Sequence, residues 1–259
     1  MPTPKIEIQI TESFPHLAHA PITEAVLEVK TRAEGPWEEA GIREALGAQL
    51  PDYPRMESRR EMEQKVLVQP GKIPEHTVND LGWTGIGCRS EDEKQVGQFH
   101  RDAFSFSRLQ PYETWERFEA EAVRLWRIHA AIARPSEVQR VGLRFINKIP
   151  VPSGGLDLDD YLVAAPRDPK DLPLPFAGFF HHDVLAVPGH AYGINLIRTI
   201  QPPLNPKGGP TLILDIDVFT TEPFGFVEEV LERRLAEMRW LKNKVFFGSI
   251  TNTTRESLQ

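Results

Sequence analysis

The chain has 259 residues, 40% of them hydrophobic, and a formal charge of -7 from 30 lysines and arginines against 37 aspartates and glutamates. A chain of this length buries roughly three quarters of its unfolded surface, so it needs no disulfide or structural metal for stability. Its single cysteine, Cys88, excludes an internal disulfide and a Cys-x-x-Cys motif. The acidic balance disfavours a broad nucleic-acid-binding surface, although it leaves room for a local basic groove.

The composition also bears on location. Residues Met1 to Thr11 alternate apolar and polar side chains without a basic leader or an apolar core, which is not the pattern of a signal or transit peptide. No apolar run approaches the ~20 residues that a membrane helix needs. Together with the single cysteine, these patterns predict a soluble cytoplasmic protein with no membrane association and no cofactor.

The first half, residues 1–135, shows patterns typical of a strand, a helix, three strands and a long helix. Ala25, Leu27 and Val29 lie on one face of the first strand. Apolar residues recur every three or four positions from Trp115 to His129, which indicates an amphipathic helix. The expected strands are Ala25–Val29, Glu61–Gln69, Trp83–Ser90 and Gln95–Leu109, and the expected helices are Trp37–Leu50 and the segment from Pro111 to Pro135.

The second half, residues 136–259, repeats this order. Its expected strands are Val138–Ile149, Phe176–Val187, His190–Ile200 and Thr211–Phe219, with a short helical stretch at Leu156–Val163 and a long helix from Pro223 to Phe247 that Thr221 caps. We therefore expect an α+β fold in which a tandem duplication of a strand-helix-three strands-helix unit forms one bent antiparallel sheet, covered on one face by long helices. The alternative is a single α+β domain whose element order repeats by chance.

Several segments carry a resemblance to a known family. They are Pro21–Val29, Phe104–Trp115, Val141–Asn147, Leu214–Phe219 and Lys242–Thr251. Together they resemble an uncharacterised, sporadically distributed prokaryotic protein family of similar length, over the whole chain. The resemblance brings no assigned catalytic residue. A patchy distribution implies mobile genes, such as defence or toxin-neutralising modules, which is an association and not a mechanism.

Charged side chains on the strands are the most informative feature for function. Glu24 and Glu28 share one face of the first strand, and Arg140, Arg144 and Lys148 share one face of its counterpart. If these strands pair, opposite charges meet across the sheet, each pair worth roughly 0.2–1 kcal/mol. This structural pairing is the preferred interpretation.

A functional alternative uses the same charges. In it, Arg108, Arg144 and Lys148 line a groove on the open sheet face and bind an anionic ligand or nucleic acid, while Glu24 or Glu28 orients them.

Two aspartates suggest a second kind of site. Asp215 and Asp217 stand two residues apart on one strand face, a spacing that brings two carboxylates to a divalent metal if Glu24 or Glu28 supplies a third ligand. A metal-dependent phosphodiesterase-like hydrolase would follow. Paired carboxylates also occur on solvated faces without any metal, and this is the favoured interpretation.

The closing helix is both apolar and basic. Trp240, Phe246 and Phe247 exceed what one buried helix face needs, so they are candidates for contact with a partner chain or with a second copy in a homodimer, although packing on the chain's own sheet is the simpler account. We expect no catalytic residues and a non-enzymatic role: recognition of a protein partner, encoded in a neighbouring gene, through the open sheet face or this helix. Anion or nucleic-acid binding is the second hypothesis and the hydrolase the third.

Overall fold

The computed structural model describes residues 4–69, 73–153, 157–167, 178–203 and 208–259. Its strands are β1 (Ile22–Ala33), β2 (Arg55–Leu67), β3 (Glu75–Arg89), β4 (Gln95–His100), β5 (Ala103–Leu109), β6 (Pro135–Pro150), β7 (Phe180–Ala186), β8 (Tyr192–Gln201), β9 (Thr211–Thr220) and β10 (Phe224–Gly225). They form one antiparallel sheet in the order β2-β3-β4-β5-β1-β6-β9-β8-β7, with β10 paired to β6.

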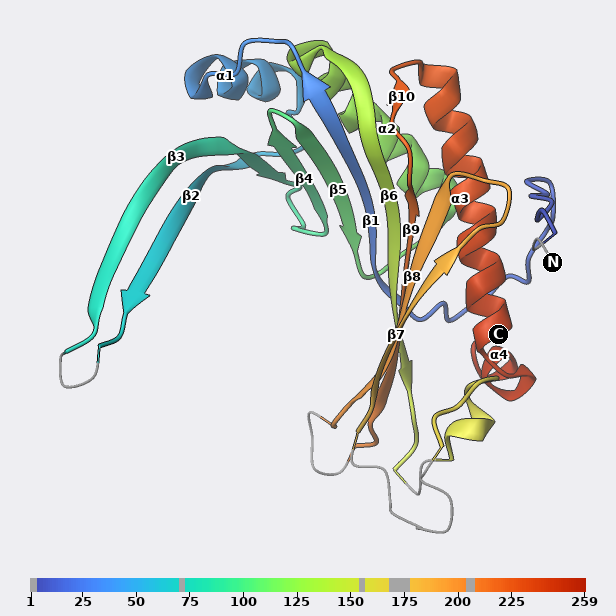
Figure 1. Ribbon diagram of the computed structural model, residues 1–259. Helices are drawn as coiled ribbons and strands as arrows, with labels where there is room; N and C mark the ends of the chain where they lie inside the picture. The colour runs from blue at the N-terminus through green and yellow to red at the C-terminus, as the bar shows by residue number, and fades with distance from the viewer. Residues whose placement is uncertain (1–3, 70–72, 154–156, 168–177, 204–207) are drawn as a thin grey trace.

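The helices are α1 (Glu39–Gln49), α2 (Trp115–Ala133), α3 (Glu228–Ser249), α4 (Asn252–Ser257) and a short 3-10 helix, η1 (Leu158–Asp160). Figure 1 shows α2 and α3 lying against one face of the sheet. They run antiparallel, because Arg239 of α3 pairs with Glu116 at the start of α2, and Arg127 of α2 pairs with Glu228 at the start of α3. The fold is thus a mixed α/β arrangement with a large antiparallel sheet and few helices. No helix in the described part is long and apolar enough to cross a membrane.

The core lies between the sheet and these helices, where the alternating strand pattern places it. Leu27 of β1 stands opposite Phe106 of β5 and Leu143 of β6, and all three are at most 1% exposed. Phe106 packs on Phe118 of α2, with ring centroids 5.6 Å apart. Alternate residues of β1, β5 and β6 are apolar and face α2. The residues between them are mostly polar and lie on the opposite face of the sheet, which we call the open face.

One strand prediction for the first half is wrong. The segment Gln95–Leu109 is not a single strand, because residues 101–102 form a turn that divides it into the hairpin β4–β5. Asp102 ties this turn to β1, since its backbone oxygen accepts from Thr31 N at 2.9 Å and its Oδ1 accepts from Ala33 N at 2.9 Å. Four strands, not three, therefore separate α1 from α2.

Both long helices begin later than expected. The amide of Arg117 donates to the hydroxyl of Thr114, which caps α2 three residues after Pro111. Helix α3 begins at Glu228, because the preceding Phe224–Gly225 pairs with β6 as β10. Thr221 is therefore not its cap.

Some expected elements fall partly outside the described residues. Of the stretch Leu156–Val163, residue 156 lies outside them, and the rest contains only η1 as a helix. The first two residues of the expected strand Phe176–Val187 and most of the connection from Pro166 to Pro175 also lie outside the described residues.

Candidate binding surfaces

Ion pairs link the strands at the centre of the open face. Arg140 of β6 donates to Glu28 of β1 at 2.6 Å and to Asp217 of β9 at 2.9 Å. Arg144 Nε donates to Asp215 Oδ1 at 2.8 Å, and its Nη2 donates to the other carboxylate oxygen. The expected attraction between the acidic first strand and its basic counterpart is present in the Glu28–Arg140 pair. Arg144, however, turns away from β1 to the second half's own aspartate.

The three cations of the expected groove do not come together. Arg108 stands opposite Ala25, whose side chain lies in the core, so Arg108 projects from the helix-covered face. There it pairs with Glu113 at 3.2 Å and is 13% exposed. Arg144 and the exposed Lys148 project from the opposite face, because they lie on the polar parity of β6. This corrects the expectation that Arg108 and Arg144 grip one ligand.

The two aspartates are already matched by arginines. Asp215 pairs with Arg144, and Asp217 accepts from Arg140 and from Asn195 Nδ2 at 3.2 Å. Glu28, the expected third metal ligand, is engaged by Arg140. Across the described residues, no group of three potential metal-ligating side chains gathers at these positions or elsewhere. The geometry is that of an ion-pair network.

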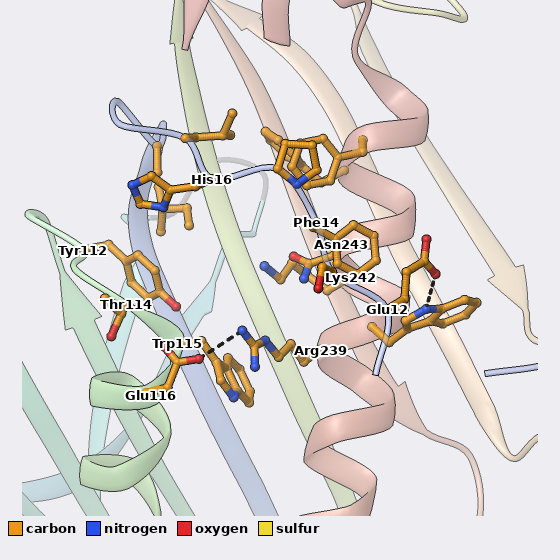
Figure 2. A pocket seen from close by; sticks show the side chains of 18 of the residues that line it. Glu12, Phe14, His16, Tyr112, Thr114, Trp115, Glu116, Arg239, Lys242 and Asn243 are labelled. Carbon is orange, nitrogen blue, oxygen red and sulfur yellow. Dashed lines mark hydrogen bonds and ion pairs between the residues drawn. The ribbon is translucent and has the colours of Figure 1, made fainter. Parts of the chain in front are cut away.

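A cavity of about 510 Å³ lies on the other side of the sheet, between α3, the loop that leads into α2, the end of β6 and the N-terminal segment 10–22. Figure 2 shows side chains from these elements around a common space. Its lining includes Phe14, Pro21, Ile22, Tyr112, Trp115, Asn147, Arg239, Trp240, Lys242, Phe246 and Phe247. Four of the five segments that carry the family resemblance contribute residues to this lining.

Lys242 is the unusual charge in this cavity. Its Nζ lies 4.2 Å from the centroid of the Phe145 ring, and within the described part of the chain it makes no hydrogen bond or ion pair. Burial, together with a smaller contribution from the nearby Arg239 charge, lowers the pKa of this ammonium group to about 7. An amine with such a pKa in a cavity marks a candidate functional site.

Two neighbours of Lys242 offer hydrogen-bond donors. Arg239 pairs with Glu116 at 3.1 Å, and its guanidinium lies 5.3 Å from the Trp115 ring centroid. Burial raises the pKa of Tyr112, so its phenol stays protonated and able to donate.

The N-terminal segment covers the aromatic end of α3. Trp240 Nε1 donates to Glu12 at 2.7 Å, and Phe247 stacks on Phe14 with ring centroids 5.7 Å apart. Trp240 and Phe246 are 7% and 5% exposed. Packing within the chain therefore accounts for much of the surface of Trp240, Phe246 and Phe247. Their expected contact with a partner stays a prediction.

Sequence reasoning missed Lys242 and Asn147, although each carries a signal. Lys242 falls four residues after Met238 and four before Phe246, within the apolar stripe of α3. Asn147 lies on the same buried face of β6 as Leu143 and Phe145 and is 2% exposed. A polar residue in an apolar series therefore pointed to the cavity in both cases.

A third feature is a two-stranded arm, formed by residues 60–67 of β2 and 75–83 of β3. Figure 1 shows it curving away from the helix-covered body. Among the described residues, none between Tyr53 and Ile86 belongs to the buried core. The arm nevertheless carries Met62, Val66 and Val78, which are 56%, 50% and 58% exposed.

Neither family models nor curated proteins give a match to this chain.

Proposed function

We propose that the protein is a non-enzymatic recognition module that binds a partner protein through the β2–β3 arm. The observation that carries this proposal is the apolar face of the arm. Met62, Val66 and Val78 are each at least half exposed, so their burial against another surface would be favourable.

The register places these three side chains on one face. Met62 stands opposite Asp80, Gln64 opposite Val78 and Val66 opposite His76, so Val78 lies diagonally between Met62 and Val66. Diagonal neighbours across two strands are within reach of each other. Because a two-stranded hairpin alone is marginally stable in water, docking of this face on a partner would also stabilise the arm.

A protein is a better occupant for the arm than nucleic acid. Residues 60–82 contain Arg60, Lys65 and Lys72 against Glu61, Glu63, Glu75 and Asp80, which gives a net charge of 3 minus 4, or -1. Binding to a phosphate backbone depends on clustered cations. The ion pairs Arg60–Asp80 and Lys65–Glu63 further engage the arm's described cations.

We also propose that the two halves arose by duplication. The support is the strand order, in which β1-β5-β4-β3 on one side of the sheet corresponds to β6-β9-β8-β7 on the other. Within the described residues β2 has no counterpart in this scheme. Of the two strands of the arm, β2 therefore departs from this symmetry, as a strand acquired for a specific function would.

The nature of the partner is proposed from the family resemblance. A sporadically distributed prokaryotic family would travel with mobile defence or toxin-neutralising genes, and a neighbouring gene would encode the partner. The open-face charges and the paired aspartates remain lesser candidates, because Arg140, Arg144, Asp215 and Asp217 are already engaged in ion pairs on that face.

The test is quantitative capture of the full tagged chain from its native host at endogenous level. The change is Val78→Asp on the apolar face, with Thr77→Asp on the opposite face as the matched control. We expect one protein to bind the wild type and the control stoichiometrically, and to bind Val78→Asp at least roughly tenfold more weakly, as for a central interface residue.

Binding must then be reproduced with the purified partner by calorimetry, and circular dichroism must show that both variants fold. Equal binding of the partner by Val78→Asp and Thr77→Asp would refute the role of the arm. Absence of a stoichiometric partner for the wild type would refute protein recognition itself.

A further inference from the structure

The cavity between α3, the loop that leads into α2 and the N-terminal segment holds a cation without an ion-pair partner. Each carboxylate in its lining has a cationic partner: Glu12 pairs with Lys244, Glu113 with Arg108 and Arg117, and Glu116 with Arg239. Lys242 has no such partner among the described residues, and its ring contact with Phe145 replaces only part of its lost hydration.

The donors in the cavity converge. Figure 2 shows Lys242 and Arg239 reaching from α3, and Tyr112 reaching from the loop before α2, toward the same space. The Arg239 charge acts on the pKa of both Lys242 and Tyr112, which agrees with this proximity. An ammonium, a guanidinium and a phenol that face one space form a set of hydrogen-bond donors for an acceptor with negative charge.

The lining also contains a group of aromatic side chains. Phe14, Trp115, Trp240, Phe246 and Phe247 all border the cavity. Its volume of about 510 Å³ lies within the usual range for small-molecule sites of roughly 300–1,000 Å³. One uncompensated cation matches one negative charge, so the ligand chemistry is that of a monoanion with an apolar body.

We propose that this cavity binds a small organic carboxylate, with its carboxylate on Lys242, Arg239 and Tyr112 and its apolar body among the aromatic side chains. The site lies on the helix-covered side of the sheet, away from the arm, and does not depend on the partner-binding role proposed above.

The proposal has a characteristic proton signature. With the pKa of Lys242 at about 7, most of this amine is neutral one pH unit higher, and a bound carboxylate favours its protonated form. Binding near pH 8 therefore takes up close to one proton. The other titratable groups facing the cavity are Glu12, His16, Tyr112, Glu113, Glu116 and Arg239.

The test uses the full chain and a panel of probes: phenylacetate, indole-3-acetate and octanoate, with phenylacetamide as the uncharged control and phenyl phosphate as the dianion. Thermal shift measures binding, and calorimetry in buffers of different ionisation enthalpy measures proton uptake. We expect at least one carboxylate to stabilise the wild type and to take up a proton, while phenylacetamide has no effect.

Lys242→Met keeps the alkyl stem over Phe145 and removes the charge, and Lys148→Met makes the same change on the opposite face of the sheet. We expect the first variant to lose at least roughly tenfold in affinity together with the proton uptake, and the second to match the wild type. No stabilisation by any carboxylate, or uptake of no proton by the wild type, overturns the proposal even if Lys242→Met fails to fold. Tighter binding of phenyl phosphate than of every carboxylate overturns the assignment of a monoanion.

Discussion

His129 is a titratable side chain enclosed entirely by the core of the first half. It is 0% exposed, and its ring lies 5.4 Å from that of Trp126 and 5.7 Å from that of Phe104. Its Nε2 is 2.8 Å from the backbone oxygen of His100, so the neutral tautomer that donates from Nε2 fits the site. Burial lowers the pKa of His129 to about 4.

This pKa gives the protein an acid-sensitive stability. Between about pH 4 and pH 6.5 the unfolded chain binds a proton at His129 and the folded chain does not, so the free energy of unfolding falls as the pH falls, with a slope of up to about 1.4 kcal/mol per pH unit. We expect His129→Phe to lose about 1 kcal/mol at pH 7 with the hydrogen bond, but to show a shallower decline below pH 6.5. Urea denaturation across this range measures both. A slope equal to that of the wild type would show that His129 does not carry the acid sensitivity.

The Arg144–Asp215 pair allows a second test at this scale. Arg144 is about half exposed, whereas the Asp215 side chain is only 9% exposed and depends on Arg144 for compensation. We expect Arg144→Met to cost about 1–3 kcal/mol in the free energy of unfolding, because it leaves a largely buried carboxylate unpaired. The double variant with Asp215→Asn should be less destabilised than the sum of the two single changes. A thermodynamic cycle by chemical denaturation gives the coupling energy, and strict additivity would show that the pair is energetically silent.

We expect the body of the protein to fold without the β2–β3 arm. Its apolar side chains lie outside the core, and Trp83 at its base stacks on Trp37 with ring centroids 6.1 Å apart. Because Arg60 stands opposite Trp83, a two-residue Asn-Gly turn can join these positions directly.

We expect this shortened chain to change in free energy of unfolding by less than about 1 kcal/mol, which corresponds to roughly 2–4 °C in Tm at this size. Calorimetry measures the shift, and the same protein should lose its partner. A large loss of Tm would instead assign the arm a structural role.

The sequence predicted elements better than their ends. Alternation located β1, β6 and β9 because each has one buried face, as the register Leu27–Leu143 illustrates. This alternation breaks at the β4–β5 turn, since Phe99 and Phe104 are five residues apart yet both point inward, and the sequence interpretation did not use that break. Periodicity also placed the start of α3 too early, because only the pairing of β10 with β6 ends the preceding segment.

The candidate site was harder to predict because it depends on contacts distant in sequence. The aromatic residues at the end of α3 predicted an exposed surface, because the contacts of Glu12 with Trp240 and of Phe14 with Phe247 join segments more than 200 residues apart. The charges on the strands were assigned to the correct faces except for Arg108, whose partner Glu113 lies beyond the end of β5. Lys242 gained its significance only from the cavity around it.

At the scale of the whole molecule, β1 and β6 join the two halves through the centre of the sheet. Each pairs with its own half on one side and with the other half on the other side, and Val29, Val141 and Phe145 on these strands are fully buried. Separation of the two halves would expose the unpaired edges of β1 and β6 together with this part of the core.

We therefore expect one cooperative unfolding transition for the full chain. Four of the five tryptophans lie in the first half, so tryptophan fluorescence reports mainly on that half, whereas far-ultraviolet circular dichroism reports on both. The unfolding transitions measured by the two methods should coincide. Fragments 1–135 and 136–259 should fail to fold cooperatively alone and should copurify when expressed together. Two separate transitions, or a stably folded single fragment, would show that the halves are independent domains.

The pairing of β1 with β6 also means that, during synthesis, β1 leaves the ribosome well before its partner strand is made. Glu28 and Arg140, which join the two strands, are 112 residues apart in sequence. At about 5–20 residues per second, a ribosome needs roughly 6–22 seconds to make the intervening chain. During this interval β1 can pair with β5 while its other edge waits without its partner. An unpaired strand edge can pair with other chains, so we expect a chaperone that shields this nascent edge to raise the yield of folded protein.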